Sequence, residues 1–128
     1  MSVRVPVSWG ELLDKTTILE IKAGRFQDPA KLANVRKELA ELLPLREQAV
    51  QAQAEIIGCE ADLKAVNEAL WEVEDEIRDC ERRQEFGPRF IELARAVYRQ
   101  NDQRSRIKRR INQLLDSGLV EEKSYQPY

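Results

Sequence analysis

The 128-residue chain contains no histidine, the side chain most often used for acid–base catalysis near neutral pH. Without histidine, Ser-His-Asp and Cys-His catalysis, mixed Cys/His zinc sites and di-iron sites built on Glu-x-x-His each lack an obligatory part. We therefore expect no metal site, no cofactor and no catalytic residues of these types. The lack of these catalytic parts favours a protein that is not an enzyme.

Cysteine is also scarce, because only Cys59 and Cys80 are present. On one straight helix these residues would lie roughly 31 Å apart, too far for a disulfide. We expect two reduced and mostly buried thiols. The sequence has no apolar run long enough to cross a membrane and no N-terminal segment typical of a signal peptide. We therefore expect a cytoplasmic protein that does not bind membranes.

Glycine and proline number only five each, aromatic residues make up 6% of the chain, and charged residues make up 34%. This composition is typical of long helices with charged surfaces. We predict an all-α fold, an antiparallel helical bundle or coiled-coil-like hairpin of about four helices. The expected parts of this single domain, 1–128, are an extended arm over 1–7, helices over 8–25, 29–57, 59–86 and 88–116, and a tail over 117–128.

A stripe of apolar residues at alternating steps of three and four marks the helix around which we expect the chain to be organised. Its members are Leu63, Val66, Leu70, Val73, Ile77 and Cys80. The other long helices are expected to stack beside it at matched height, with the shorter first helix lying across them.

Local signals mark the ends of the helices. Ser8 and Glu11 have the spacing of a capping box, and Asp28 precedes a proline suited to a first helical turn. Pro44 is expected to kink the second helix or to end its first part. Gly87, followed by proline, predicts a tight turn in which the glycine supplies the special backbone conformation.

Gly58 leaves two alternatives open. The apolar spacing continues through it without losing phase, so one rod from Leu45 to Phe86 is possible, and such a rod would favour a dimer. Glycine is also the usual residue at the left-handed end of a helix. We favour a break at Gly58, because it gives segments of similar length.

Two neighbouring segments carry opposite charge. Residues 59–86 hold ten acidic and four basic residues, a local charge of −6, whereas residues 88–112 hold two acidic and eight basic residues, a local charge of +6. The basic residues Arg106, Arg109 and Arg110 would by themselves suggest nucleic-acid binding. An acidic partner helix in the same hairpin is the simpler explanation, so we do not expect nucleic acid as a partner.

Three polar residues of the last helix, Asn101, Arg104 and Lys108, fall within its apolar stripe. Buried charge needs a partner, and the expected partners are Glu20, Asn67, Glu74 or an outside anion. Two hypotheses remain open: a polar layer that fixes register and oligomeric state, or a pocket walled by aromatic residues that binds a small anionic or phosphorylated ligand. The candidate cluster comprises Glu20, Asn67, Trp71, Glu74, Tyr98, Asn101, Arg104 and Lys108.

The chain resembles a family of small bacterial proteins known only as a domain of unknown function. The resemblance covers nearly the whole length and rests on VPVSWGELLDKTTILEIK, KLANV, VNEALWEVEDEIRDCE, LARAVYRQND, RSRIKRRIN and EEKSY. It implies a cytoplasmic bacterial protein with no established activity, linked to surface-glycan assembly through the genes that accompany it. The family motifs include Glu11, Lys15, Glu20, Asn67, Trp71, Glu74, Arg78, Tyr98, Asn101, Asp102, Arg104, Lys108 and Tyr125.

Together these observations predict a non-enzymatic helical binding or interaction module. Its expected partner is a second copy of the chain, as a homo-oligomer, or another protein. The alternative is a protein that binds, or acts on, a small anionic ligand through the buried polar cluster.

Overall fold

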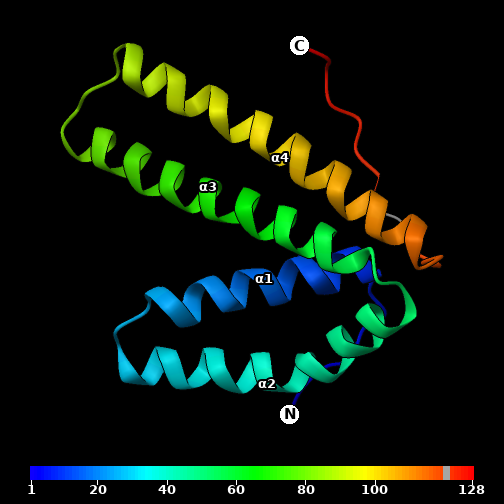
Figure 1. The fold of residues 1–128 in the computed structure, drawn as a ribbon. Coiled ribbons are helices and arrows are strands. Elements are labelled where there is room, and N and C mark those ends of the chain that lie inside the picture. The colour runs from blue at the N-terminus through cyan, green and yellow to red at the C-terminus, as the bar shows by residue number, and fades with distance from the viewer. Residues whose placement is uncertain (120–121) are drawn as a thin grey trace.

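The structure, a computed structural model, describes residues 1–119 and 122–128. Its helices are α1 (Trp9–Arg25), α2 (Pro29–Ala52), α3 (Ile56–Arg82) and α4 (Pro88–Leu114), and the described residues contain no strand. Figure 1 shows two antiparallel hairpins, α1–α2 and α3–α4. The all-α class with four helices is therefore confirmed.

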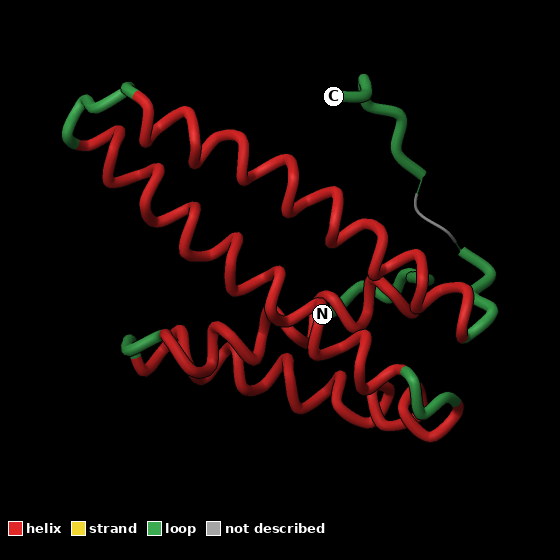
Figure 2. The backbone as a smooth tube through the Cα atoms, turned by 45° about the horizontal axis from the view of Figure 1, so that its top comes forward, coloured by secondary structure: helices red, strands yellow, loops and turns green. Residues whose placement is uncertain are grey.

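The two hairpins are joined through α1. This helix packs on α2, on α3 and on α4, whereas α2 has only a small contact with α3. The expected stack of three long helices at matched height is therefore wrong. Instead, α1 lies against one end of the α3–α4 hairpin, and the other end projects away from α1 and α2 (Figure 2).

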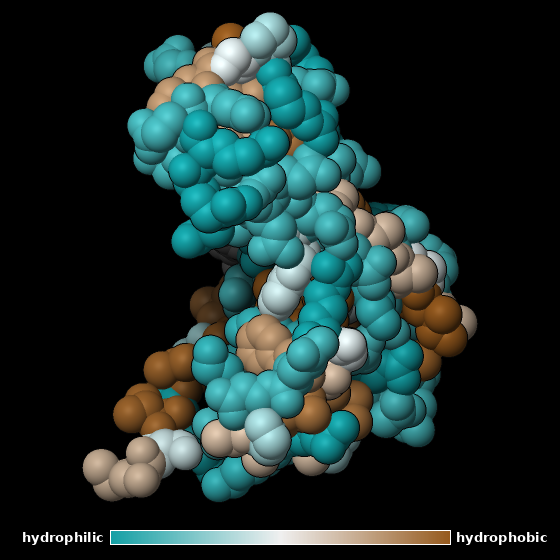
Figure 3. Space-filling model, turned by 90° about the vertical axis from the view of Figure 1, so that its left-hand side faces the viewer, coloured by the Kyte–Doolittle hydropathy of each residue, from teal (hydrophilic) through white to brown (hydrophobic). Residues whose placement is uncertain are grey.

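The main apolar core lies where α1 meets the open end of the α3–α4 hairpin. Its buried members are Leu13, Ala49, Ile56, Leu63, Val66, Ile107 and Ile111. Of the predicted α3 stripe, Leu63, Val66 and Cys80 are buried, while the three residues between Val66 and Cys80 are half-buried. The far end of the hairpin forms a largely hydrophilic upper lobe that a constriction separates from the rest of the molecule (Figure 3).

The break between α2 and α3 lies before Gly58. Helix α2 ends at Ala52, Gln53 is extended with φ −147° and ψ 113°, and α3 begins at Ile56. Ala49 and Ile56, on either side of this break, both lie in the core. Gly58 is helical, without a positive φ, so the expected bounds 29–57 and 59–86 are corrected to Pro29–Ala52 and Ile56–Arg82.

The other predicted end signals are partly confirmed. The Asp28 carboxylate accepts the Ala30 N–H at 2.9 Å, and α2 continues through Pro44. Figure 1 shows that α2 bends along its length. After α3, the left-handed residue is Gln84 (φ 57°), whereas Gly87 has a negative φ of −83°. The glycine therefore does not supply the special conformation that we predicted for this turn.

The termini flank the helical core. Residues 1–7 are exposed, and neither they nor the described residues after α4, 115–119 and 122–128, form a helix or a strand. Glu121, the first residue of the EEKSY motif, lies outside the described residues. Within the described chain, no helix has both the length and the apolar character required to cross a membrane.

Candidate functional site

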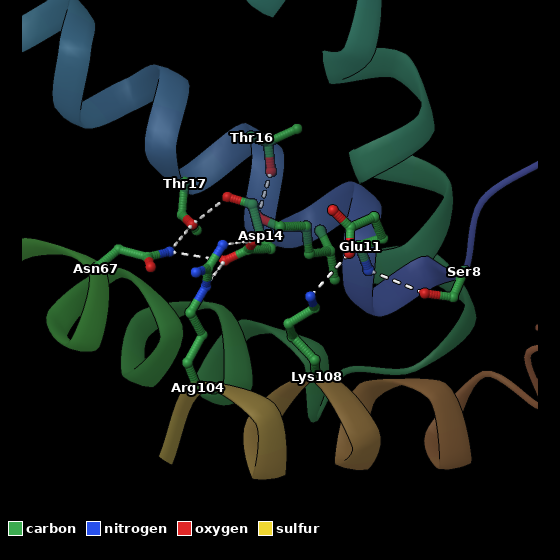
Figure 4. Close-up of polar contacts among 9 residues, drawn as sticks. Ser8, Glu11, Asp14, Thr16, Thr17, Asn67, Arg104 and Lys108 are labelled. Carbon is green, nitrogen blue, oxygen red and sulfur yellow. Dashed lines mark hydrogen bonds and ion pairs between the residues drawn. The ribbon is translucent and has the colours of Figure 1, made fainter. Parts of the chain in front are cut away.

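Helix α4 presents a row of polar side chains to α1. Arg104, Lys108 and Asn112 are spaced by four residues, so they lie on one side of the helix. Figure 4 shows Arg104 and Lys108 pointing toward the first half of α1. We call the connected set the polar ladder, and it consists of Glu11, Asp14, Asn67, Arg104, Lys108 and Asn112.

Asp14 is the centre of the polar ladder. Only 2% of it is exposed, and its Oδ1 atom accepts hydrogen bonds from Arg104 Nε at 2.9 Å and Asn67 Nδ2 at 3.0 Å. A second guanidinium nitrogen of Arg104 donates to Oδ2, so the pair is bidentate. The Asn67 amide also donates to Thr17 Oγ1 at 3.0 Å. One carboxylate thus connects α1, α3 and α4.

Lys108 forms the next step of the ladder. Its ammonium group is 2.8 Å from the Glu11 carboxylate, and only 8% of the residue is exposed. Of the two cations that we expected to be buried, Lys108 is buried, whereas the Arg104 side chain is 29% exposed. The carboxylates that pair with them, Asp14 and Glu11, are not among the expected partners. The expected partner Glu74 instead pairs with Arg78 one turn along α3, and Glu20 lies 3.3 Å from Lys64.

The ladder ends at the N-terminus of α1, where the first backbone N–H groups have no partners within the helix. Trp9 N–H donates to Ser117 Oγ at 3.3 Å, Gly10 N–H to Asn112 Oδ1 at 2.7 Å, and Glu11 N–H to Ser8 Oγ at 3.1 Å. Only the serine half of the predicted capping box is therefore seen, because the Glu11 side chain binds Lys108.

Gly10 allows α1 to approach α4 closely. A Cβ atom at this position would lie 2.6 Å from the carbonyl oxygen of Lys108, which is backbone and cannot turn aside. The absence of a side chain is therefore what allows the helices to approach near enough for the Asn112 bond.

A groove opens beside the ladder between α1, α3 and α4. Its volume is about 410 Å³, and Trp71 and Leu70 form part of its apolar wall. Trp71 also contacts Phe26, with ring centroids 6.1 Å apart, and Arg25, whose guanidinium carbon is 5.5 Å from the ring centroid. The predicted residues that meet in the groove are Asn67, Trp71, Glu74, Asn101 and Arg104.

The remaining predicted residues lie elsewhere. Lys108 belongs to the polar ladder, where it pairs with Glu11. Glu20 forms an ion pair with Lys64, which joins α1 to α3. Tyr98, expected as a wall of the same pocket, instead lies in a separate hollow of about 580 Å³ between α4 and the tail. There its ring centroid is 5.0 Å from that of Tyr128. The neighbouring Asp102 carboxylate raises the pKa of Tyr128.

The charges of this site are largely balanced within the chain. Every buried side-chain nitrogen and oxygen of the described residues has a hydrogen-bond partner, and those residues contain no His/Cys/Asp/Glu group suited to a metal ion. Burial raises the pKa of the Cys59 thiol, which reduces its nucleophilic thiolate fraction at neutral pH. The arrangement is therefore suited to holding three helices in one register.

Sequence reasoning missed Asp14, Asn112 and Gly10 as members of this site. A signal was available, because Gly10, Asp14, Thr17 and Ile21 recur at steps of four, three and four along α1. These residues form a second buried side of the helix, in addition to the apolar one that contains Leu13 and Thr16. A helix that packs between two neighbours has two buried sides.

Among known protein families, residues 3–128 match the one described as "Family of unknown function (DUF6165)". Neither the curated proteins nor the solved structures gave a match.

Proposed function

We propose that this chain, which belongs to the DUF6165 family of unknown function, is a non-enzymatic helical module that acts by binding another protein chain. The proposal includes the bacterial and cytoplasmic setting and the accessory role in surface-glycan assembly that the resemblance implies.

One observation carries the proposal: the polar groups of the buried site are used within the chain, while apolar groups remain open on its surface. Asp14 bonds to Arg104 and Asn67, and Lys108 bonds to Glu11. By contrast, Ile91 and Phe86 on the projecting end of the α3–α4 hairpin are 55% and 46% exposed. Satisfied buried polar groups stabilise a unique packing, and exposed apolar groups favour binding to a protein surface.

The test is the mass of the full chain in solution, alone and in an extract of the cells that produce it. Sedimentation velocity of the fluorescently labelled chain measures this mass. We expect a species heavier than the 14.9 kDa chain in at least one of the two conditions. Sedimentation as a 14.9 kDa particle in both would contradict an interaction module.

The second candidate is a small-ligand site in the groove, favoured by its volume and by the Trp71 ring and the Arg104 guanidinium on its walls. The charge of this arginine is already balanced by Asp14, and Glu74 and Asp75 also line the groove. An anionic ligand would therefore gain less from Arg104 than it would from an unpaired arginine.

Thermal unfolding with inorganic phosphate or glucose 1-phosphate distinguishes the two candidates. A ligand that binds the folded state raises the melting temperature, and the rise should disappear in Asn101→Leu, which changes the groove wall without removing a ladder residue. The interaction module predicts no rise. A rise that is lost in this variant would favour the ligand site.

A further inference from the structure

The α3–α4 hairpin is covered by α1 over only part of its length. Toward the tip of the hairpin, the contacts at the end of α1 reach Trp71 and Glu72 on α3, and the contact of Asp14 reaches Arg104 on α4. Each hairpin helix has 27 residues, so it is about 40 Å long at 1.5 Å per residue. We call the part beyond these contacts, residues 73–97, the arm; it projects from the rest of the molecule in Figures 1 and 2.

The arm has one well-buried seam and one open apolar side. Cys80 and Leu93 are 2% and 3% exposed, so the contact between α3 and α4 continues toward the tip. Other apolar residues of the arm stay half-buried or exposed, and on α4 they recur at the helical spacing of a single wide face. We call this set the docking face, and it consists of Ile77, Phe90, Ile91, Ala94 and Val97.

Charges beside the docking face indicate what it binds. Glu81 lies one turn after Ile77 on α3, and Arg95 lies one turn after Ile91 on α4. Within the part of the chain that the structure describes, neither Glu81 nor Arg95 forms an ion pair. The unpaired charge of the arm is therefore acidic on one helix and basic on the other.

The same asymmetry extends over both helices. Helix α3 has nine acidic and three basic residues, a net charge of −6, and α4 has two acidic and eight basic residues, a net charge of +6. A two-fold axis that runs along the arm, parallel to its two helices, would place α3 of one copy against α4 of the other, so that both contacts join opposite charges. A second copy supplies this complementary pattern automatically, whereas an unrelated partner would have to carry both signs in the same arrangement.

We propose that the docking face binds the docking face of a second copy, so that two arms form an antiparallel four-helix bundle related by a two-fold axis. This inference rests on the proposed function and names its partner. The bundle covers Ile91 and Phe90 from solvent and places Glu81 of each chain beside Arg95 of the other.

Sedimentation equilibrium of the full chain tests the dimer directly. We expect twice the 14.9 kDa mass at about 100 μM protein, with dissociation favoured by added salt. Replacing an apolar anchor, Ile91→Ser, should raise the dissociation constant at least about tenfold. The matched control is Ile57→Ser, because Ile57 is 54% exposed but lies at the other end of the hairpin; its dissociation constant should equal that of the wild type.

Charge reversal tests the orientation. Glu81→Arg places a guanidinium opposite Arg95 at both contacts, and Arg95→Glu places a carboxylate opposite Glu81 at both contacts, so each variant alone should be monomeric. An equimolar mixture should form a heterodimer, because each variant then meets the opposite charge in its partner. Unchanged helicity and melting temperature of the isolated variants, by circular dichroism, show that the arm remains folded.

Several results would overturn the inference. A wild-type chain that is monomeric at this concentration excludes the dimer, and a dimer insensitive to Ile91→Ser, or variants that do not recombine, shows a different interface. If the chain alone is monomeric but sediments faster in cell extract, the two-fold dimer is wrong and the interaction module stands.

Discussion

At the scale of single residues, the buried carboxylate of Asp14 depends strongly on its hydrogen-bond partners. It accepts hydrogen bonds from two side chains of two other helices, and only 2% of it is exposed. A buried ion pair has a large desolvation cost, so its net stabilisation is small while the loss of one partner is severe. The polar ladder therefore selects one packing of α1 more than it adds to the total stability.

The first prediction compares single and double replacements of this pair. Asp14→Leu leaves the Arg104 guanidinium without its carboxylate and should lower the free energy of unfolding by about 3 kcal/mol. Adding Arg104→Met removes the guanidinium charge as well and should recover most of that loss. Urea unfolding of the two single variants and the double variant measures both effects. Additive losses would show that the two side chains are not energetically coupled.

The second prediction concerns the close approach at Gly10. Gly10→Ala places a methyl group 2.6 Å from the Lys108 carbonyl oxygen, so α1 must shift and the protein should lose about 1 to 3 kcal/mol. Gly24→Ala in the same helix is the matched control, because no atom lies within 4 Å of its added Cβ. Alanine favours the helix, so this control should be neutral or slightly stabilising. Equal melting temperatures of the two variants would contradict the close contact.

At the scale of elements, the ends of helices depend on packing as well as on local signals. Ala49 and Ile56 are both buried, and the Arg46 guanidinium forms two hydrogen bonds to Glu60, at 2.8 and 2.6 Å, across the α2–α3 turn. These bonds raise the pKa of Arg46. The turn therefore falls at 53–55, although a glycine follows soon after in the sequence.

The third prediction tests whether α3 contains Gly58. Because this glycine is helical and its added Cβ would meet no atom within 4 Å, Gly58→Ala should stabilise the protein by up to about 1 kcal/mol. A glycine in a left-handed helix end would give the opposite sign, since alanine is strained there. Thermal unfolding followed by circular dichroism at 222 nm measures the change, and a lower melting temperature would place the helix end at Gly58.

At the scale of the whole molecule, several basic residues of α4 pair with acidic residues of the same chain. Arg109 pairs with Glu122 of the tail at 2.8 Å, and Arg110 lies 3.2 Å from Glu55. Although such exposed pairs add little to stability, they reduce the positive field that would attract phosphates. The formal net charge of −2 acts in the same direction.

The fourth prediction follows from this balance. A fluorescent DNA duplex should show no change in anisotropy with the full chain at about 50 mM salt, where phosphate contacts are strong. Arg106→Glu should leave that result unchanged. Binding that weakens steeply with salt, and that this variant removes, would show that α4 offers its basic side to nucleic acid.

The sequence alone determined the features that depend on neighbouring residues. Apolar spacing predicted four helices, Asp28 and Pro29 predicted the beginning of α2, and the position of Lys108 within an apolar stripe predicted a buried cation. These features follow from the helical repeat and from capping, which act over a few residues.

Only the tertiary structure decided which helix supplies the partners of Arg104 and Lys108. Glu11 and Asp14 were no better placed by sequence than Glu20 and Glu74, because an ion pair depends on which surfaces meet and not on distance along the chain. The entry of α1 between its neighbours gave it two buried sides, and that arrangement selected Asp14, Gly10 and Asn112.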